Sequence, residues 1–106
     1  EQLGYGVVWF PEAIGRDPMV ASSFVLANTT SLIAATGILN IYSRDPMSTA
    51  MAQQTLCEQS GGRFLLGLGV SHSVLVNMRG HDYSKPLAAM RNYVAGIAEC
   101  HKHIGI

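Results

Sequence analysis

The sequence predicts an α/β fold made of three consecutive parallel strand–helix units. Short apolar runs alternate with helix-start signals along the chain, and one of these signals, Arg-Asp-Pro-Met, occurs twice, beginning at Arg16 and at Arg44. Strands that alternate with helices form right-handed βαβ units around a parallel sheet. The offset of 28 residues from Arg16 to Arg44 is typical of one unit of a (β/α) barrel.

The apolar runs predict strands at residues 6–10, 32–38 and 64–70. None of these runs alternates cleanly between apolar and polar side chains. Such continuous runs are typical of strands that are buried on both faces, as in a parallel sheet. We therefore expect three parallel strands with both faces covered.

Each expected helix begins at a proline: Pro18, Pro46 and Pro86. An aspartate precedes the first two, and its carboxylate can accept hydrogen bonds from the free N–H groups of the first turn. Proline fits the first helical position, because its missing N–H has no partner there. We expect helices over residues 18–29, 46–60 and 86–100. Their buried faces should carry, in the first, Val20, Phe24 and Ala27, and in the third, Leu87, Met90, Val94 and Ile97.

The composition fits one cytoplasmic domain that spans residues 1–106. The chain is 48% hydrophobic and 13% charged, which allows a real core, and its formal net charge is zero. A protein that binds nucleic acid through phosphates usually has a basic excess, and a membrane span needs ~20 apolar residues in a row; the sequence has neither. Cys57 and Cys100 show no metal-ligand spacing, which is typical of reduced cytosolic thiols.

Candidate site residues gather at the carboxyl ends of the expected strands, where barrels have their active sites. Glu12 follows the first strand, the second ends in Thr36-Gly37-Ile38-Leu39-Asn40, and the third ends in Gly67-Leu68-Gly69-Val70-Ser71-His72. The glycines here do not match a dinucleotide fingerprint, because the next helix is expected some 15 residues later. No cluster of carboxylates or cysteines supports a metal site at His101 and His103.

Each candidate also has a purely structural interpretation. Glu12 could be a solvated loop acid, and His72 could cap a loop. The glycines could end a strand or permit close packing. Arg63, at the start of the third strand, is expected to serve stability.

Three linked motifs narrow the interpretation: LGYGVVWFPEAIGRDP, AATGILNIYSRDP and SGGRFLLGLGVSH. In this order and spacing they resemble the luciferase-like monooxygenase superfamily, and within it the coenzyme F420-dependent oxidoreductases related to methylenetetrahydromethanopterin reductase and F420-dependent glucose-6-phosphate dehydrogenase. The resemblance runs from about Leu3 to Val94. It implies a partial (β/α)8 TIM barrel that contains barrel strands two to four.

The resemblance also implies a function, which is hydride transfer between ring carbon C5 of the deazaflavin F420 and a small organic substrate. It implies catalytic roles for Glu12 and His72, and cofactor contacts from Gly37, Ile38, Asn40, Ser71 and His72. The Gly37–Ile38 bond matches a bulge behind the ring that often contains a cis peptide in this family. Ala13 stands where relatives often have a histidine, so the proton donor stays open.

Two other functions remain open at this stage. The cofactor could be FMN, which would make the protein a monooxygenase. Alternatively, the chain could be a non-catalytic half-barrel that serves assembly, because three units leave sheet edges bare and a closed barrel typically has eight strands and ~250 residues. We expect the edges to be covered by the missing barrel half, or the chain to form a homo-oligomer through helices 18–29 and 46–60. The isolated chain is expected to be inactive.

Overall fold

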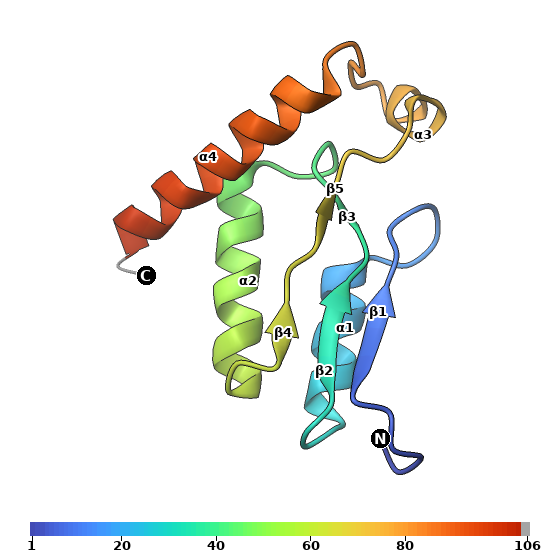
Figure 1. Cartoon of the computed structure of the whole chain (residues 1–106), viewed down its shortest axis with the longest axis vertical. Helices are drawn as coiled ribbons and strands as arrows, with labels where there is room; N and C mark the ends of the chain where they lie inside the picture. The colour runs from blue at the N-terminus through green and yellow to red at the C-terminus, as the bar shows by residue number, and fades with distance from the viewer. Residues whose placement is uncertain (105–106) are drawn as a thin grey trace. The chain divides into compact units, whose positions relative to one another are not determined.

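The computed structural model describes residues 1–104, and the chain divides into two compact units. The first unit consists of Glu1–Leu39 and Ala52–Leu68, and the second of Asn40–Met51 and Gly69–Ile106. The elements follow the order β1 (Val7–Phe10), α1 (Pro18–Ala27), β2 (Ile33–Thr36), β3 (Leu39–Asn40), α2 (Pro46–Ser60), β4 (Phe64–Leu65), β5 (Leu68–Gly69), α3 (Ser73–Met78) and α4 (Pro86–Ile104) (Figure 1). The assignment of one domain to residues 1–106 stays a prediction.

A parallel sheet with the strand order β1-β2-β4 forms the centre of the first unit. Phe10 lies opposite Thr36, and Ala35 lies opposite Leu65. This confirms the predicted parallel pairing of the strands. Because the strands are parallel, their carboxyl ends meet at one edge of the sheet, where the candidate residues were expected.

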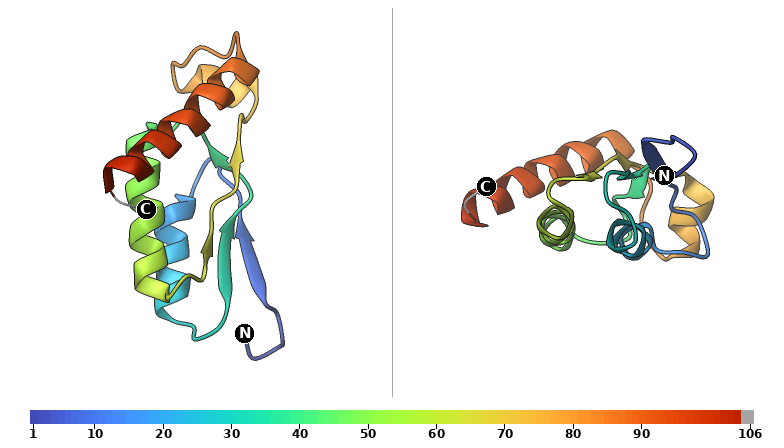
Figure 2. Two further views of the ribbon diagram at one scale, coloured as in Figure 1. Left: turned by 60° about the vertical axis from the view of Figure 1, so that its left-hand side comes forward. Right: turned by 90° about the horizontal axis from the view of Figure 1, so that it is seen from below.

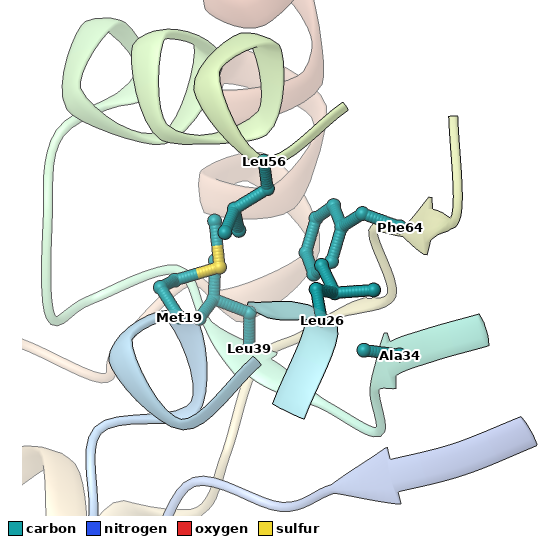
Figure 3. Packing of buried hydrophobic residues seen from close by; sticks show 6 residues of the cluster. All are labelled: Met19, Leu26, Ala34, Leu39, Leu56 and Phe64. Atoms are coloured by element: carbon teal, nitrogen blue, oxygen red, sulfur yellow. The ribbon is translucent and has the colours of Figure 1, made fainter. Parts of the chain in front are cut away.

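Helix α1 and the part of α2 within the first unit cover one face of this sheet (Figure 2). The side chains of the two helices and the strands meet in a hydrophobic core (Figure 3), which consists of Met19, Leu26, Ala34, Leu39, Leu56 and Phe64. The core therefore packs α1, α2 and the strands of the first unit against one another.

The predicted buried face of α1 is wrong. Val20 and Phe24 are 70% and 71% exposed, and Ala27 is exposed as well. The buried stripe consists of Met19, Ser22 and Leu26. The helix is apolar on nearly all sides, so the sequence offered two competing stripes. Ser22 can be buried because its hydroxyl has a hydrogen-bond partner: it donates to the Pro18 carbonyl oxygen at 2.6 Å.

The predicted burial of the strands on both faces is also wrong for the residues that the structure describes. Along β1, β2 and β4, four apolar side chains that point away from the core are exposed: Val7, Trp9, Ile33 and Leu65. We call these four side chains the open sheet face. Exposure on this face is limited to these four side chains among the described strand residues, because Ala35, the register partner of Trp9 and Leu65, is buried.

The second and third predicted strands are each interrupted. Strand β2 ends at Thr36 and β3 begins at Leu39, whereas β4 ends at Leu65 and β5 begins at Leu68. β3 and β5 pair with each other in a second small sheet. The interruptions fall on residues 37–38 and 66–67, each of which contains a glycine.

The second unit contains a helix that the sequence reasoning missed. Helix α3 begins at Ser73, directly after His72, so the expectation of some 15 residues before the next helix was wrong. Helix α4 begins at Pro86 as predicted and continues to Ile104. Its buried side is formed by Tyr93 and Ile97, whereas Leu87 is 82% exposed and Val94 50% exposed, so the predicted face was correct only in part.

Candidate functional site

In the first unit, the carboxyl ends of β1 and β2 bring Glu12 and Gly37 to the same edge of the sheet. The Gly37 N–H donates to the Phe10 carbonyl oxygen at 2.9 Å, which extends the parallel pairing by one residue. Glu12 follows two residues after Phe10 and is half-buried. A carboxylate and a residue without a side chain therefore adjoin this edge.

The Gly37–Ile38 peptide bond is cis, as the resemblance led us to expect. Gly37 is exposed and Ile38 is half-buried, so one side of this peptide is open. Trp9 restricts position 37, because a Cβ atom on Gly37 would lie 3.0 Å from the Trp9 Cε3 atom. The close approach of the indole explains why a glycine occupies this position.

Thr36 and Gly67 hold the bulge in place. The Thr36 hydroxyl donates to the Gly67 carbonyl oxygen and accepts from the Gly67 N–H, both at 2.8 Å. A Cβ atom on Gly67 would overlap the Thr36 carbonyl oxygen. Gly67 thus permits close packing between the backbones of two chain segments, one of the structural interpretations given for the glycines. The Leu39 N–H also donates to the Gly67 carbonyl, at 2.7 Å.

The other candidate residues belong to the second unit, where Asn40 is the last residue of β3 and Ser71 and His72 follow β5. Asn40 is 1% exposed, and its Oδ1 atom accepts a hydrogen bond from the Tyr42 N–H at 2.9 Å. Ser71 has a positive φ of 58°, which is uncommon for a residue other than glycine. His72 is exposed at the N-cap of α3, and its side chain makes no capping hydrogen bond there.

The candidates thus fall into two groups. Glu12, Gly37 and Ile38 belong to the first unit, and Asn40, Ser71 and His72 to the second. The sequence reasoning did not single out Trp9, although its place in β1, one register position from the strand end, could have indicated it. It also missed Tyr83, whose hydroxyl donates to the Ser71 carbonyl oxygen at 3.0 Å.

Residues 1–104 contain no group of three or more histidine, cysteine, aspartate or glutamate side chains arranged to hold a metal ion. Within the same residues, no helix has both the length and the apolar character needed to cross a membrane.

The family model described as luciferase-like monooxygenase matches residues 1–101 of the chain. The chain belongs to the luciferase-like monooxygenase family. This match covers all three sequence motifs that carry the resemblance, and with them every candidate site residue.

Relatives of this luciferase-like chain carry more specific names. It is 36% identical over 95 residues to a protein of Mycobacterium tuberculosis that is provisionally named a coenzyme F420-dependent oxidoreductase, a match that covers 89% of this chain and 27% of the relative. It is 34% identical over 98 residues to a 5,10-methylenetetrahydromethanopterin reductase of Methanolobus tindarius, covering 92% of this chain and 30% of the relative. The chain therefore spans less than a third of the length of these relatives.

A solved structure shows the fold of this luciferase-like chain. The coenzyme F420-dependent tetrahydromethanopterin reductase of Methanopyrus kandleri matches with a TM-score of 0.77 and 23% identity, covering 91% of this chain and 32% of that one. The parallel strand–helix units thus correspond to part of a TIM barrel, as predicted.

Proposed function

We propose that this chain forms the cofactor-ring part of an F420-dependent oxidoreductase, which transfers a hydride between the deazaflavin and a small organic substrate. The observation that carries the proposal is the identity of 34–36% to relatives, of which one is named as F420-dependent, over a segment that includes every candidate residue. Because the chain spans less than a third of these relatives, the activity is proposed for the full-length gene product.

The residues of the first unit fit the flat ring of a deazaflavin. The exposed Gly37 has no side chain to obstruct a ring, and the neighbouring Trp9 indole leaves no room for one. The Thr36–Gly67 contacts fix this backbone before any ligand arrives, which lowers the cost of ordering the site on binding. When bound, F420 supplies the carbon that accepts or donates the hydride.

The remaining candidates have distinct proposed roles. The Glu12 carboxylate holds a negative charge or a proton near the ring. Ser71 and Asn40 line the cofactor channel in the second unit. The His72 imidazole contacts the cofactor or moves a proton at its exposed ring nitrogens. These roles stay predictions.

Cofactor binding to the purified full-length protein tests the proposal. Titration with F420, followed by its fluorescence, should show binding, whereas FMN should bind more weakly. Gly37→Val should weaken F420 binding at least about tenfold, because its branched side chain would collide with the Trp9 indole and displace the backbone that faces the ring. Gly6→Val is the matched control, since a Cβ atom on Gly6 would meet nothing within 4 Å.

Turnover distinguishes the role of Glu12. Glu12→Gln should leave F420 affinity within about twofold and lower kcat by about 10²-fold or more, as expected when a charge or proton carrier is lost without a change in shape. Glu58→Gln, an exposed acid on α2, is the control. Tight binding of FMN together with no binding of F420 would favour an FMN-dependent monooxygenase. A protein that binds neither flavin would favour the assembly module.

A further inference from the structure

The corner between β5 and α3 is an unusual piece of backbone. Ser71 has left-handed backbone geometry at φ 58°, and His72 then begins α3 through the hydrogen bond from the Val76 N–H to its carbonyl oxygen at 3.1 Å. L-residues with side chains adopt positive φ values only where surrounding contacts hold them. Something in the second unit must therefore hold this corner.

Tyr83 is the residue that reaches it. The Tyr83 hydroxyl donates to the Ser71 carbonyl oxygen at 3.0 Å across 12 positions of sequence. Tyr83 lies on a short turn of its own, in which the Ser84 N–H and hydroxyl both donate to the Asp82 carboxylate at 2.9 Å. This turn restricts the backbone on either side of Tyr83 and so limits where its hydroxyl can lie.

The Tyr83 ring is held by a second tyrosine. Its centroid lies 5.7 Å from that of Tyr42 at an interplanar angle of 40°, a tilted aromatic pair, and the His81 ring lies 6.5 Å from Tyr42. The Tyr42 N–H in turn donates to the Asn40 side chain at 2.9 Å. A connected path thus joins Asn40 to Ser71 through two aromatic rings.

The two tyrosine hydroxyls differ in a way that makes them a matched pair. The Tyr83 hydroxyl has a defined acceptor, whereas the Tyr42 hydroxyl is buried without a hydrogen-bond partner among the described residues. Burial raises the pKa of Tyr42, with smaller contributions from Tyr83 and Asp82. The Tyr42 hydroxyl therefore stays protonated, and its removal from the buried site breaks no bond.

We propose that Tyr83 is a positioning residue for the Ser71–His72 corner, and that its hydroxyl keeps these two residues in the geometry that cofactor binding requires. The proposal rests on the proposed function for its link to F420. Its structural half, the hold on the corner, stands on the second unit alone. Tyr42 contributes the ring against which Tyr83 packs, and its hydroxyl is dispensable.

Tyr83→Phe and Tyr42→Phe in the full-length protein form the test. Both variants keep the ring, but only Tyr83→Phe removes the donor to Ser71. Tyr83→Phe should speed hydrogen–deuterium exchange of the amides at residues 72–76 and weaken F420 binding, each by about fivefold to tenfold, as expected for one lost hydrogen bond. Tyr42→Phe should change neither by more than about twofold.

A rescue experiment separates positioning from general stability. Glycine adopts positive φ without help, so Tyr83→Phe introduced into a Ser71→Gly protein should change exchange and affinity by no more than about twofold. Equal effects of Tyr83→Phe in the wild-type and Ser71→Gly backgrounds would overturn positioning. So would exchange at residues 72–76 that matches wild type, or a loss in Tyr42→Phe as large as that in Tyr83→Phe.

The two proposals can fail separately. If the wild-type protein does not bind F420, the proposed function fails, and exchange in the ligand-free protein still decides whether Tyr83 holds the corner. If wild type binds F420 and Tyr83→Phe binds it equally well, the positioning proposal fails while the proposed function stands.

Discussion

The Trp9 indole occupies the space that a side chain at Gly37 would need, because a Cβ atom there would lie 3.0 Å from the Trp9 Cε3 atom. This distance is tighter than ordinary van der Waals contact. Since the Trp9 side chain is 56% exposed, its ring can shift when something larger replaces the glycine. The contact therefore specifies the local shape of the bulge more than it contributes to overall stability.

This contact predicts a coupling between the two positions. Gly37→Ala should destabilise the protein by about 1 kcal/mol. The same change should cost less in a Trp9→Ala background, because the indole that the new methyl group would meet is absent. Urea unfolding of the two single variants and the double variant measures the coupling, which we expect to be about 0.5 kcal/mol or more. Strict additivity of the two changes would show that the indole does not restrict Gly37.

A second prediction concerns Arg63, whose contacts fit the structural role expected from the sequence. Its guanidinium donates to carbonyl oxygens of the α1 end and of the chain that follows, including Leu26 at 3.0 Å and Leu32 at 2.7 Å, and its Nε atom donates to the Ser60 carbonyl at 3.0 Å. Carbonyls at the ends of two helices thus find one cationic partner, which also suits the helix dipoles.

Arg63→Lys should lower the free energy of unfolding by about 1–3 kcal/mol, because the lysine ammonium group cannot donate to all the carbonyl oxygens that the planar guanidinium contacts. Arg91→Lys, at an exposed position of α4, is the matched control and should stay within about 0.5 kcal/mol of wild type. Thermal or urea unfolding measures both. If the two variants were equally stable, the Arg63 hydrogen bonds would contribute nothing net.

A third prediction concerns pH. Hydrogen bonds to the Glu1 carboxylate, above all from the Ser31 N–H at 2.6 Å, lower its pKa from the ordinary 4.5 to about 2. The Leu32 N–H also donates to it, at 2.9 Å. A lowered pKa in the folded state means that the carboxylate contributes its stability above pH 4.5 and loses it as the pH falls toward 2.

The unfolding free energy should therefore decrease between pH 4.5 and 2, and Glu1→Gln should remove part of this decrease. Glu58→Gln serves as the control for losing one exposed acid, and it should leave the slope unchanged. Unfolding at a series of pH values measures the slopes. Identical slopes for wild type and Glu1→Gln would refute a folded-state role for this carboxylate.

The sequence predicted the strand–helix order because its signals are local. Asp17 accepts from the N–H groups of Met19 and Val20, which is the cap that the Asp-Pro pair predicts. Helix α2 begins and ends as expected, at Pro46 and Ser60. Such signals require only neighbouring residues, so they can be read without knowledge of the tertiary structure.

The burial pattern could not be predicted in the same way. The apolar α1 has no polar side to exclude, so only the sheet decides that Met19 rather than Val20 is buried. The strand interruptions likewise depend on contacts between distant residues, such as Thr36 with Gly67. For the site, the family motifs indicated the strand ends, but they did not indicate Trp9 or Tyr83, which act through residues far away in the sequence.

The last prediction concerns association, which we propose for two different surfaces. Phe24 on α1 is 71% exposed, and it lines a groove of about 440 Å³ together with Phe10 and Val20. Leu65 on the open sheet face is 51% exposed. In the full-length relatives' fold, further barrel strands would cover a sheet face of this kind, whereas an outer helix face stays available to a second copy of the chain.

Two single variants should therefore act differently in two proteins. In the 106-residue chain, both Leu65→Gln and Phe24→Gln should weaken self-association at micromolar concentration, measured by sedimentation. In the full-length protein only Phe24→Gln should do so, by about tenfold or more, since burial of a phenylalanine side chain contributes about 1.5–3 kcal/mol. There Leu65→Gln should instead destabilise folding by more than about 2 kcal/mol, because an amide would be buried within the barrel. A monomeric full-length wild-type protein would argue against the helix interface. A full-length Leu65→Gln protein as stable as wild type would argue against burial of the open sheet face.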